Sequence, residues 1–215
     1  MKILIIGANG QIGTRLVKQL KESEHTPVAM VRKKDQVDQF ENEGIETVLA
    51  DLEEDIGHAF KNVDGVVFSA GSGAHTPKSQ TKVIDEQGGI KAIDAALDAG
   101  VNRFIMVSAL MANRDPDAWP DSMQHYYEAK SKADDYLRST DLNYTILMPG
   151  RLTNDEGNRK VELSEKISDL EGRSITRDDV ASVIVELIDS ENTYHKSLDL
   201  LQGDEPVREA VAKIS

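Results

Sequence analysis

The sequence predicts an α/β fold, a doubly wound parallel sheet with helices on both faces, from three observations. A run at residues 1–6, apolar except for Lys2, is typical of a strand buried on both faces. Gly7, Gly10 and Gly13 follow it directly and lead into a stretch with apolar residues at helical spacing. Short β-branched or leucine-rich runs then alternate with helical stretches, a pattern that favours right-handed crossovers between parallel strands.

The other predicted strands follow the first one along the chain. They lie at 27–31, 46–49, 65–68, 103–107 and 144–148, with a weaker last candidate at 198–201. The predicted helices lie between them, at 11–22, 34–43, 56–61, 79–99, 122–140 and 177–190. Gly100 follows the fourth of these helices and is typical of a helix end.

One domain, residues 1–215, accounts for the whole pattern, because this length suits one α/β core and neither a repeat nor a linker interrupts it. After Pro149-Gly150 the alternation weakens, and charged residues are mixed through the following stretch. We therefore expect residues 151–175 to form a small C-terminal lobe on the substrate side of this domain.

The first turn has the spacing G-x-x-G-x-x-G, which differs from the general G-x-G-x-x-G fingerprint. A strand, a glycine-rich turn and a helix start form a dinucleotide cradle, because bare backbone approaches the pyrophosphate and helix N–H groups face its charge. An ordinary tight turn is the alternative. The expected cofactor contacts in this turn are Gly7, Asn9, Gly10, Gln11, Ile12 and Gly13.

The residue after the second strand indicates which cofactor is bound. An NAD site usually places an acidic residue there, whereas this chain has Val31-Arg32-Lys33. The planar guanidinium of Arg32 could pair with a 2′-phosphate, so we expect NADP, with NAD less favoured. The alternative for Arg32 is a solvated charge at the start of the next helix.

Two further strand ends carry candidate cofactor contacts. Asp51 and Leu52 follow the third strand; Asp51 could accept a hydrogen bond from the adenine amino group, or could form a capping box with Glu54 for the next helix. Both roles remain open. After the fourth strand, the small residues Ser69, Ala70 and Gly71 would let the chain lie against a ribose or the nicotinamide, the alternative being a flexible loop.

Candidate catalytic residues follow the fifth strand. Ser108 lies at its end, and Tyr126 and Lys130 are four apart on a predicted helix, so they share one face. An ammonium near a phenol favours the phenolate and lowers the pKa of the tyrosine. Such a tyrosine can give a proton to a carbonyl oxygen while hydride arrives from a nicotinamide. Tyr-x-x-x-Lys is common by chance, but Ser108 makes the set more specific.

Composition excludes several classes of partner. The formal net charge of −13 argues against nucleic acid and anionic lipid, and no run is apolar enough to span a bilayer. Without cysteines there is no disulfide or thiolate chemistry, and without an export signal we expect the cytoplasm. The helix at 122–140 has a single apolar stripe, which favours a monomer. The histidines lack metal-site spacing, and we expect no metal; they are His25, His58, His75, His125 and His195.

With these residues in hand, the chain resembles the atypical short-chain dehydrogenase/reductase family, in particular its small NAD(P)-binding members related to nucleoside-sugar epimerases. The likeness covers nearly the whole chain and includes the segments 7–13, 51–52, 99–104, 107–108, 144–150 and 175–181, together with Tyr126 and Lys130. It implies a Rossmann-type sheet and a catalytic set of Ser108, Tyr126 and Lys130. It also implies that Lys130 contacts the nicotinamide ribose and that Pro149 and Gly150 pass beside the nicotinamide.

The chain also departs from that family. The Asn that is usual in the extended members is absent around residues 85–89, and the stretch after Gly150 leaves little room for a sugar-nucleotide lobe. Epimerisation of sugar nucleotides is therefore not expected. The expected function is NADP-dependent reduction of a small carbonyl or quinone-like substrate. One alternative is a non-catalytic dinucleotide-binding sensor, and another is a flavin or biliverdin-type reductase.

Overall fold

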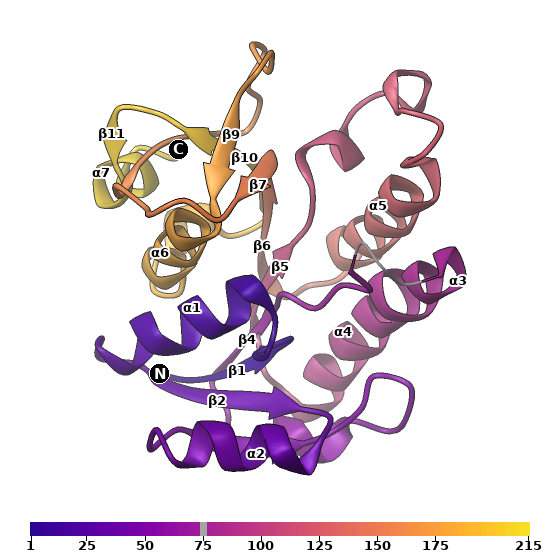
Figure 1. Ribbon diagram of the computed structural model, residues 1–215, viewed down its shortest axis with the longest axis vertical. Helices are drawn as coiled ribbons and strands as arrows, with labels where there is room; N and C mark the ends of the chain where they lie inside the picture. The colour runs from indigo at the N-terminus through magenta and orange to yellow at the C-terminus, as the bar shows by residue number, and fades with distance from the viewer. Residues whose placement is uncertain (74–76) are drawn as a thin grey trace.

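The computed structural model describes residues 1–73 and 77–215. Its main feature is a mostly parallel central sheet with helices around it (Figure 1). His75 lies outside the described residues. Within them the main sheet has the order β11-β8-β10-β6-β5-β4-β1-β2-β3. The parallel strands are β1 (Lys2–Ile6), β2 (Thr26–Val31), β3 (Glu46–Leu49), β4 (Gly65–Phe68), β5 (Arg103–Val107), β6 (Asn143–Pro149) and β10 (Lys196–Gln202). The predicted strands and the doubly wound fold class are thus confirmed.

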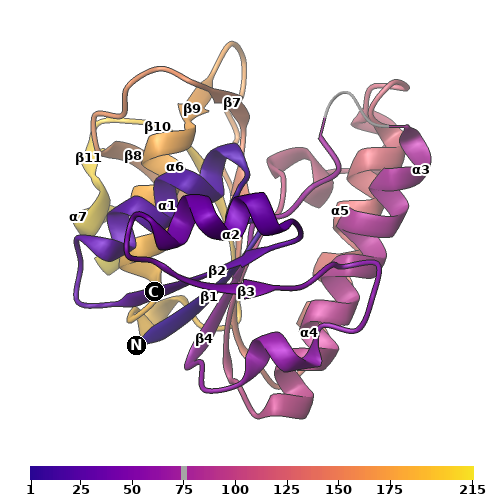
Figure 2. The same ribbon diagram turned by 60° about the horizontal axis from the view of Figure 1, so that its bottom comes forward.

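Helices cover both faces of this sheet because the strand residues alternate in direction. Ile3 and Ile5 of β1 pack on one side, and Leu4 and Ile6 pack on the other. The first side is covered by α1 (Gln11–Lys21), α2 (Lys34–Glu41), α6 (Arg177–Leu187) and α7 (Val207–Ala212). The second side is covered by α4 (Gly88–Ala99) and α5 (Gln124–Arg138), as Figure 2 shows. None of the described helices is long and apolar enough to cross a membrane.

The predicted helix at 79–99 is helical throughout, but a wider turn separates its two α-helical parts. It begins as α3 (Lys78–Thr81), widens into a π-helical turn, η2 (Lys82–Gln87), and continues as α4. Gly88 and Gly89 follow the wide turn, and added Cβ atoms there would lie 3.2 Å from Leu52 Cδ1 and from Ala133 Cβ respectively. The glycine pair therefore lets α4 approach the 51–54 turn and α5. Gly100 ends α4 with a φ of 69°, as predicted.

The stretch after Gly150 contains several short elements that the sequence analysis did not predict. β7 (Arg151–Thr153) and β9 (Ser174–Thr176) pair in a small parallel sheet of their own. β8 (Lys160–Ser164) joins the main sheet antiparallel to β10, and β11 (Glu205–Pro206) pairs with β8. Such two- to five-residue strands at a sheet edge carry too few alternating residues to be recognised from periodicity. Single turns of 3₁₀ helix complete the fold, at η1 (Gly57–Phe60), η3 (Leu110–Asn113), η4 (Pro116–Ala118) and η5 (Glu191–Thr193).

Candidate functional site

The turn between β1 and α1 is made of closely packed backbone. Gly7 has a φ of 89°, and the Gly10 N–H donates to the Gly7 carbonyl oxygen at 2.9 Å. A Cβ on Gly7 would lie 2.6 Å from the Ala70 nitrogen, and a Cβ on Gly13 only 2.2 Å from the Gly7 oxygen. These two positions therefore require glycine for the fold itself. Gly10 is different, because it is exposed and its nearest neighbour to an added Cβ would be the Gly7 oxygen at 3.1 Å.

The N-terminus of α1 is left open toward solvent by this turn. Gly10 is its N-cap, no side chain caps it, and its first turn carries no acidic residue. Asn9, Gly10 and Gln11 are exposed, whereas Ile12 and Gly13 are buried under them. The unpaired N–H groups of a helix start, reached over bare glycine backbone, fit a pyrophosphate. The residues present therefore suit a dinucleotide cofactor.

The loop after β4 lies directly beside this turn. The Ser69 N–H donates to the Ile6 carbonyl oxygen at 2.9 Å, and its hydroxyl donates to the same oxygen at 3.1 Å. Because β1 and β4 are parallel neighbours, Ser69, Ala70 and Gly71 continue along the cradle. The structure thus brings these predicted contacts together with the glycine-rich turn at the carboxyl edge of the sheet (Figure 1).

Arg32 and Asp51 occupy the ends of β2 and β3, farther along the same edge. The Arg32 side chain is exposed and makes no hydrogen bond or ion pair with a described residue. Asp51 Oδ1 accepts from the Glu53 N–H at 3.0 Å, which closes a local turn. The predicted capping box with Glu54 is therefore wrong, because the next helical turn begins only at Gly57. Leu52 is buried, and its carbonyl oxygen accepts from Lys91 Nζ at 2.6 Å.

Lys130 lies on the buried face of α5, one turn after Tyr126. Its side chain is 5% exposed, and Nζ lies 3.1 Å from Asp85 Oδ1 and 3.3 Å from the Val107 carbonyl oxygen. The same Nζ is 5.9 Å from the centre of the Tyr126 ring. Lys130 is thus paired with a carboxylate and reaches the tyrosine only at longer range.

The pKa of Tyr126 departs from its ordinary value in the direction opposite to the prediction. Burial raises the pKa of Tyr126, and this effect outweighs the positive charge of Lys130, which lowers it. Asp85 adds to the increase. The predicted lowering of the tyrosine pKa is therefore wrong, because the sequence did not reveal the desolvation or the second charge. The phenol stays protonated across the neutral range.

Ser108 lies at the end of β5 and is also buried. Its hydroxyl donates to Asp134 Oδ2 at 2.5 Å, and Asp134 is 1% exposed with no partner for Oδ1 among the described residues. Burial raises the pKa of Asp134 to about 7, although the Ser108 hydrogen bond opposes this. The structure brings Ser108, Tyr126 and Lys130 to one place, but it turns the Ser108 hydroxyl toward a buried acid.

Asp85 and Asp134 are the residues of this site that sequence reasoning missed. Asp134 follows Lys130 by four residues, so helical spacing alone placed it on the same face. Apolar residues alone define the stripe seen in the sequence of this helix, yet Lys130 and Asp134 are among the buried residues of α5. Asp85 is completely buried in the π-helical turn η2, and only an acid between apolar residues at 83–84 and the glycines at 88–89 hinted at it.

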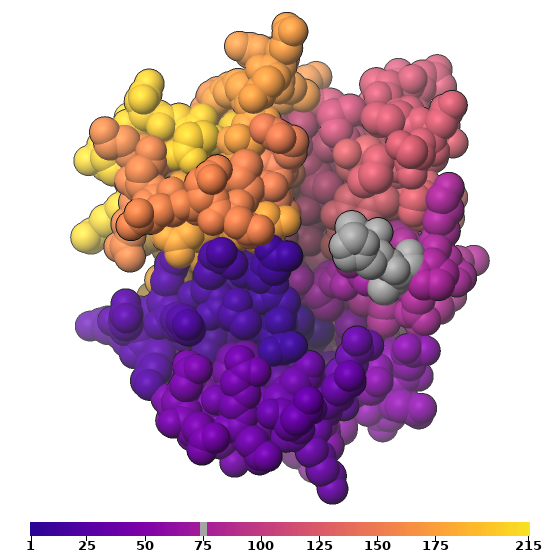
Figure 3. All heavy atoms as spheres, viewed as in Figure 1, coloured from indigo at the N-terminus to yellow at the C-terminus, as the bar shows by residue number. Residues whose placement is uncertain are grey.

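Two loop regions form walls on either side of the carboxyl edge, and Figure 3 shows the recess between them. One wall is the 110–123 segment, where Trp119 Nε1 donates to the Met111 carbonyl oxygen at 2.7 Å. The other wall is the 151–176 segment, beginning after Pro149 and Gly150 at the end of β6. Arg114 joins the first wall to the second through the Ile167 carbonyl oxygen at 3.0 Å, and to β10 through Asp199 Oδ2 at 2.5 Å.

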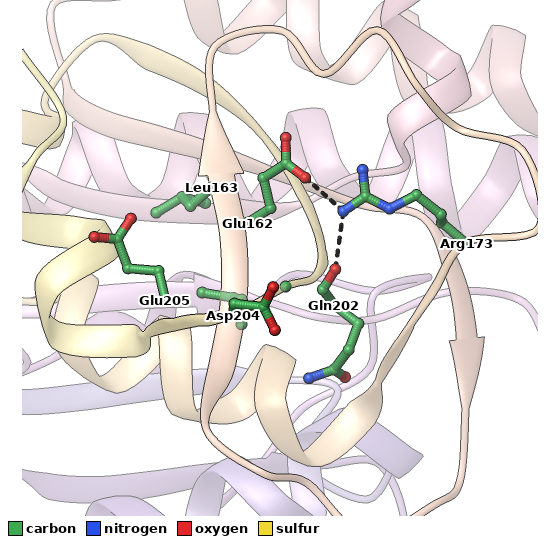
Figure 4. A pocket seen from close by; sticks show the side chains of 8 residues that line it. Glu162, Leu163, Arg173, Gln202, Asp204 and Glu205 are labelled. Atoms are coloured by element: carbon green, nitrogen blue, oxygen red, sulfur yellow. Dashed lines mark hydrogen bonds and ion pairs between the residues drawn. The ribbon is translucent and has the colours of Figure 1, made fainter.

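A separate surface hollow of about 520 Å³ lies against β8, the strand next to the β11 edge of the sheet (Figure 4). Arg173 crosses it to Glu162 at 2.5 Å and to the Gln202 carbonyl oxygen at 2.9 Å. None of the residues that line it is a predicted site residue. The candidate site is therefore the recess at the carboxyl edge of the sheet.

Comparisons with known proteins identify the family of this chain. Residues 7–191 match a family described as NAD(P)H-binding. A relative in Bacillus subtilis, named "Uncharacterized sugar epimerase YhfK", is 44% identical over 218 residues, with 100% of both chains covered. A solved structure titled "Putative NAD-dependent epimerase/dehydratase from Bacillus halodurans" is 46% identical with a TM-score of 0.95, covering 99% of both chains. The structure of the oxidoreductase ylbE from Lactococcus lactis is 31% identical with a TM-score of 0.87, covering 100% of this chain and 96% of the other.

The matched segment contains the glycine-rich turn, the loop after β4, the ends of β5 and β6, and α5. The two solved structures share the mostly parallel sheet that positions these segments. This chain therefore belongs to the NAD(P)H-binding family and has its oxidoreductase/epimerase-like Rossmann fold.

Proposed function

We propose that this protein is an NADP-dependent oxidoreductase that reduces a small carbonyl or quinone-like compound, with Tyr126 as the proton donor. The observation that carries the proposal is the placement of Tyr126, one helical turn from Lys130 at the edge where the glycine-rich turn opens, with burial raising the pKa of its phenol. Its hydroxyl makes no hydrogen bond to a described residue, so it is available to a substrate oxygen. A general acid must carry its proton at the working pH, and this tyrosine does.

The residues of the chain divide the remaining work. The open start of α1 and the backbone of Gly10 would hold the pyrophosphate. A bound nicotinamide supplies hydride to the substrate carbon. Tyr126 donates its hydroxyl proton to the substrate oxygen and afterwards recovers a proton from solvent. Lys130 has three N–H donors; one is donated to the Val107 oxygen, and the contact with Asp85 Oδ1 at 3.1 Å is an ion pair, so a donor remains for a ribose hydroxyl.

The preference for NADP rests on Arg32. Its guanidinium is exposed beyond β2 and free of partners among the described residues, and two further cations, Lys33 and Lys34, follow it. An acidic residue that would hold the ribose hydroxyls of NAD is absent from this position. A 2′-phosphate would thus meet a cation and no competing carboxylate at the end of β2.

The test is oxidation of NADPH against aldehydes, ketones, quinones and flavins, with a sugar nucleotide included because of the name of the Bacillus subtilis relative. Tyr126→Phe removes one hydroxyl and keeps the ring, so turnover should fall by about a hundred- to ten-thousandfold while cofactor affinity stays. Tyr127→Phe is the matched control, because this neighbour packs its ring against Trp119. A parent rate that Tyr126→Phe leaves intact would remove Tyr126 from the mechanism.

A second candidate function is a non-catalytic NADP(H) sensor. Buried carboxylates already engage two of the three predicted catalytic residues: Asp85 pairs with Lys130, and Asp134 accepts the hydrogen bond of Ser108. This observation favours a sensor. These contacts also have a purely structural explanation. Tight NADPH binding without oxidation by any compound of the panel would favour the sensor over the reductase.

A further inference from the structure

Two arginines without a carboxylate partner lie at the start of α6 and on the second turn of α1. Arg15 is the residue on α1, and its Nη1 donates back to the Gln11 carbonyl oxygen at 2.7 Å. Arg177 is the first residue of α6, and its Nη1 donates to Asn154 Oδ1 at 3.1 Å. Neither arginine forms an ion pair with a residue that the structure describes. Both charges are thus uncompensated in a chain whose formal net charge is −13.

The packing of α1 on α6 brings these two arginines next to each other. The helices lie side by side (Figures 1 and 2), and Gln19 Nε2 bridges them by donating to Asp178 Oδ1 at 3.1 Å. Arg15 is one helical turn before Gln19, and Arg177 directly precedes Asp178. Burial lowers the pKa of Arg177, and the positive charge of Arg15 lowers it further, as expected for two neighbouring cations.

The pair lies between the glycine-rich turn and the 151–176 wall. Helical side chains lean toward the N-terminus, so the Arg15 guanidinium lies beside the first turn of α1. Its partner Gln11 is the first residue of that helix, directly after the N-cap Gly10. The partner of Arg177, Asn154, directly follows β7 in the wall. One arginine therefore flanks the open helix start, and the other is attached to the substrate side of the recess.

We propose that Arg15 and Arg177 form a clamp for the diphosphate of the cofactor, and that the bound diphosphate fixes the 151–176 wall against the glycine-rich turn. The proposal rests on the dinucleotide binding proposed above. It goes beyond that function because it couples the cofactor to the substrate side of the recess. The cofactor then binds first and completes the wall against which the substrate binds.

The chemistry of the pair suits a diphosphate. A guanidinium presents planar pairs of N–H donors that match two phosphate oxygens, and it keeps its charge at any working pH. The helix start supplies N–H groups to one side of the anion, and the arginines supply donors to the remaining oxygens. Without an anion the two cations repel each other, and a diphosphate between them turns this repulsion into attraction. Anion binding therefore favours the arrangement in which both arginines are held close.

The connection from Arg177 to the wall is short. β9 runs directly into α6 and pairs with β7, and Asn154 follows β7. An Arg177 side chain that is held by a diphosphate therefore holds both strands of this small sheet, one through the chain and the other through the Asn154 hydrogen bond.

Isothermal titration calorimetry with NADPH tests the clamp. Arg15→Gln and Arg177→Gln each remove one charge and keep a polar side chain at a half-buried position. Each should weaken NADPH binding by about tenfold or more, and Arg177→Lys should recover part of the loss. Lys18→Gln is the matched control, because Lys18 is an exposed cation on the same helix, and its NADPH affinity should equal that of the parent.

Adenosine 2′-monophosphate separates the diphosphate from other sources of negative charge. It carries the 2′-phosphate and the adenine but no diphosphate, so both arginine variants should bind it like the parent. An equal loss of affinity for this compound would show a general effect of charge and overturns the proposal. Parent-like NADPH affinity in both folded arginine variants, as checked by circular dichroism, also overturns it.

Hydrogen exchange followed by mass spectrometry tests the coupling to the wall. NADPH should slow the exchange of the backbone amides at 151–154 and 174–176 in the parent and in Lys18→Gln. The slowing should be much smaller in Arg177→Gln at an NADPH concentration that saturates this variant, so that occupancy is not the cause. Equal protection in the parent and in Arg177→Gln overturns the coupling.

The clamp and the proposed function fail in different experiments. NADPH binding that depends on Arg15 and Arg177, without oxidation by any compound of the panel, supports the clamp and counts against the reductase alone. Oxidation of NADPH by a parent whose affinity does not depend on these arginines supports the reductase and overturns the clamp. A parent that does not bind NADPH overturns both.

Discussion

The glycine-rich turn at 7–13 presents backbone to its ligand, whereas the α5 face with Tyr126 and Lys130 presents side chains. In the turn, a missing Cβ is the essential feature, since Gly7 and Gly13 have backbone oxygen or nitrogen where a side chain would be. On α5, the two buried charged side chains each contact a residue from another segment: Lys130 contacts Asp85, and Asp134 contacts Ser108. The two regions differ because the proposed cofactor cradle depends on local space, whereas the proposed proton transfer depends on a long-range balance of buried charges.

The largest effect is expected from a side chain placed in the open part of the turn, which tests whether the cradle needs bare backbone there. Gly10 has a φ of −78° and a ψ of 170°, a backbone conformation that valine adopts readily, so Gly10→Val should fold. The branched side chain would occupy the path of the pyrophosphate, and dinucleotide affinity should fall by at least about a hundredfold. Isothermal titration calorimetry with NADPH measures the loss.

Gly57→Val is the control for this variant, because Gly57 begins a 3₁₀ turn with only Asp55 Oδ1, at 3.4 Å, near an added Cβ. Its NADPH affinity should equal that of the parent. Parent-like affinity of Gly10→Val would show that the cradle lies elsewhere.

Asp134 tests the balance of buried charges on α5. Its folded pKa of about 7 lies above the ordinary value of 3.8, so the folded state holds the proton more tightly than the unfolded chain. Stability is therefore lost as pH rises between these two values, and the loss is complete above pH 7. Asp134→Asn removes this dependence and can still accept the Ser108 hydrogen bond. Relative to the parent, its free energy of unfolding should improve by about 2–3 kcal/mol between pH 5 and pH 8.

Urea denaturation at the two pH values measures this difference. Asp135→Asn, at the exposed neighbouring position, is the control and should keep the pH dependence of the parent, because Asp134 is unchanged in it. Equal pH dependence of the parent and Asp134→Asn would mean that the pKa of Asp134 is not raised in the folded state. The buried charges on α5 would then not be balanced as described.

The smallest expected effect concerns Arg32, which belongs to the cofactor half but acts through a side chain. Arg32→Ala should weaken NADPH binding by about ten- to a hundredfold, since a charge-assisted contact contributes roughly 1.5–3 kcal/mol. NADH binding should barely change. Competition binding with both cofactors gives the ratio, and Lys34→Ala is the neighbouring control. Equal affinity of the parent for NADPH and NADH contradicts the NADP assignment.

The cofactor half was predictable because its signals are local. The run at 1–6, the glycine spacing and the following helix lie within one short stretch, and the strand ends that adjoin them follow from parallel pairing. The capping box between Asp51 and Glu54 does not form. The same spacing of residues is compatible with a cap and with the isolated turn that forms instead. The short strands β7, β8, β9 and β11 were missed because they depend on pairing across the chain.

The sequence by itself determined the doubly wound sheet, the glycine-rich cradle and the shared helical face of Tyr126 and Lys130. These follow from backbone geometry and from spacing within a few residues. The tertiary structure decided which charges meet: it buried Asp85 against Lys130, turned Ser108 toward Asp134, and raised the pKa of Tyr126 where its neighbour alone would have lowered it. The physical reason is that desolvation and charge pairing depend on every segment packed around a group, and spacing along one helix contains none of that information.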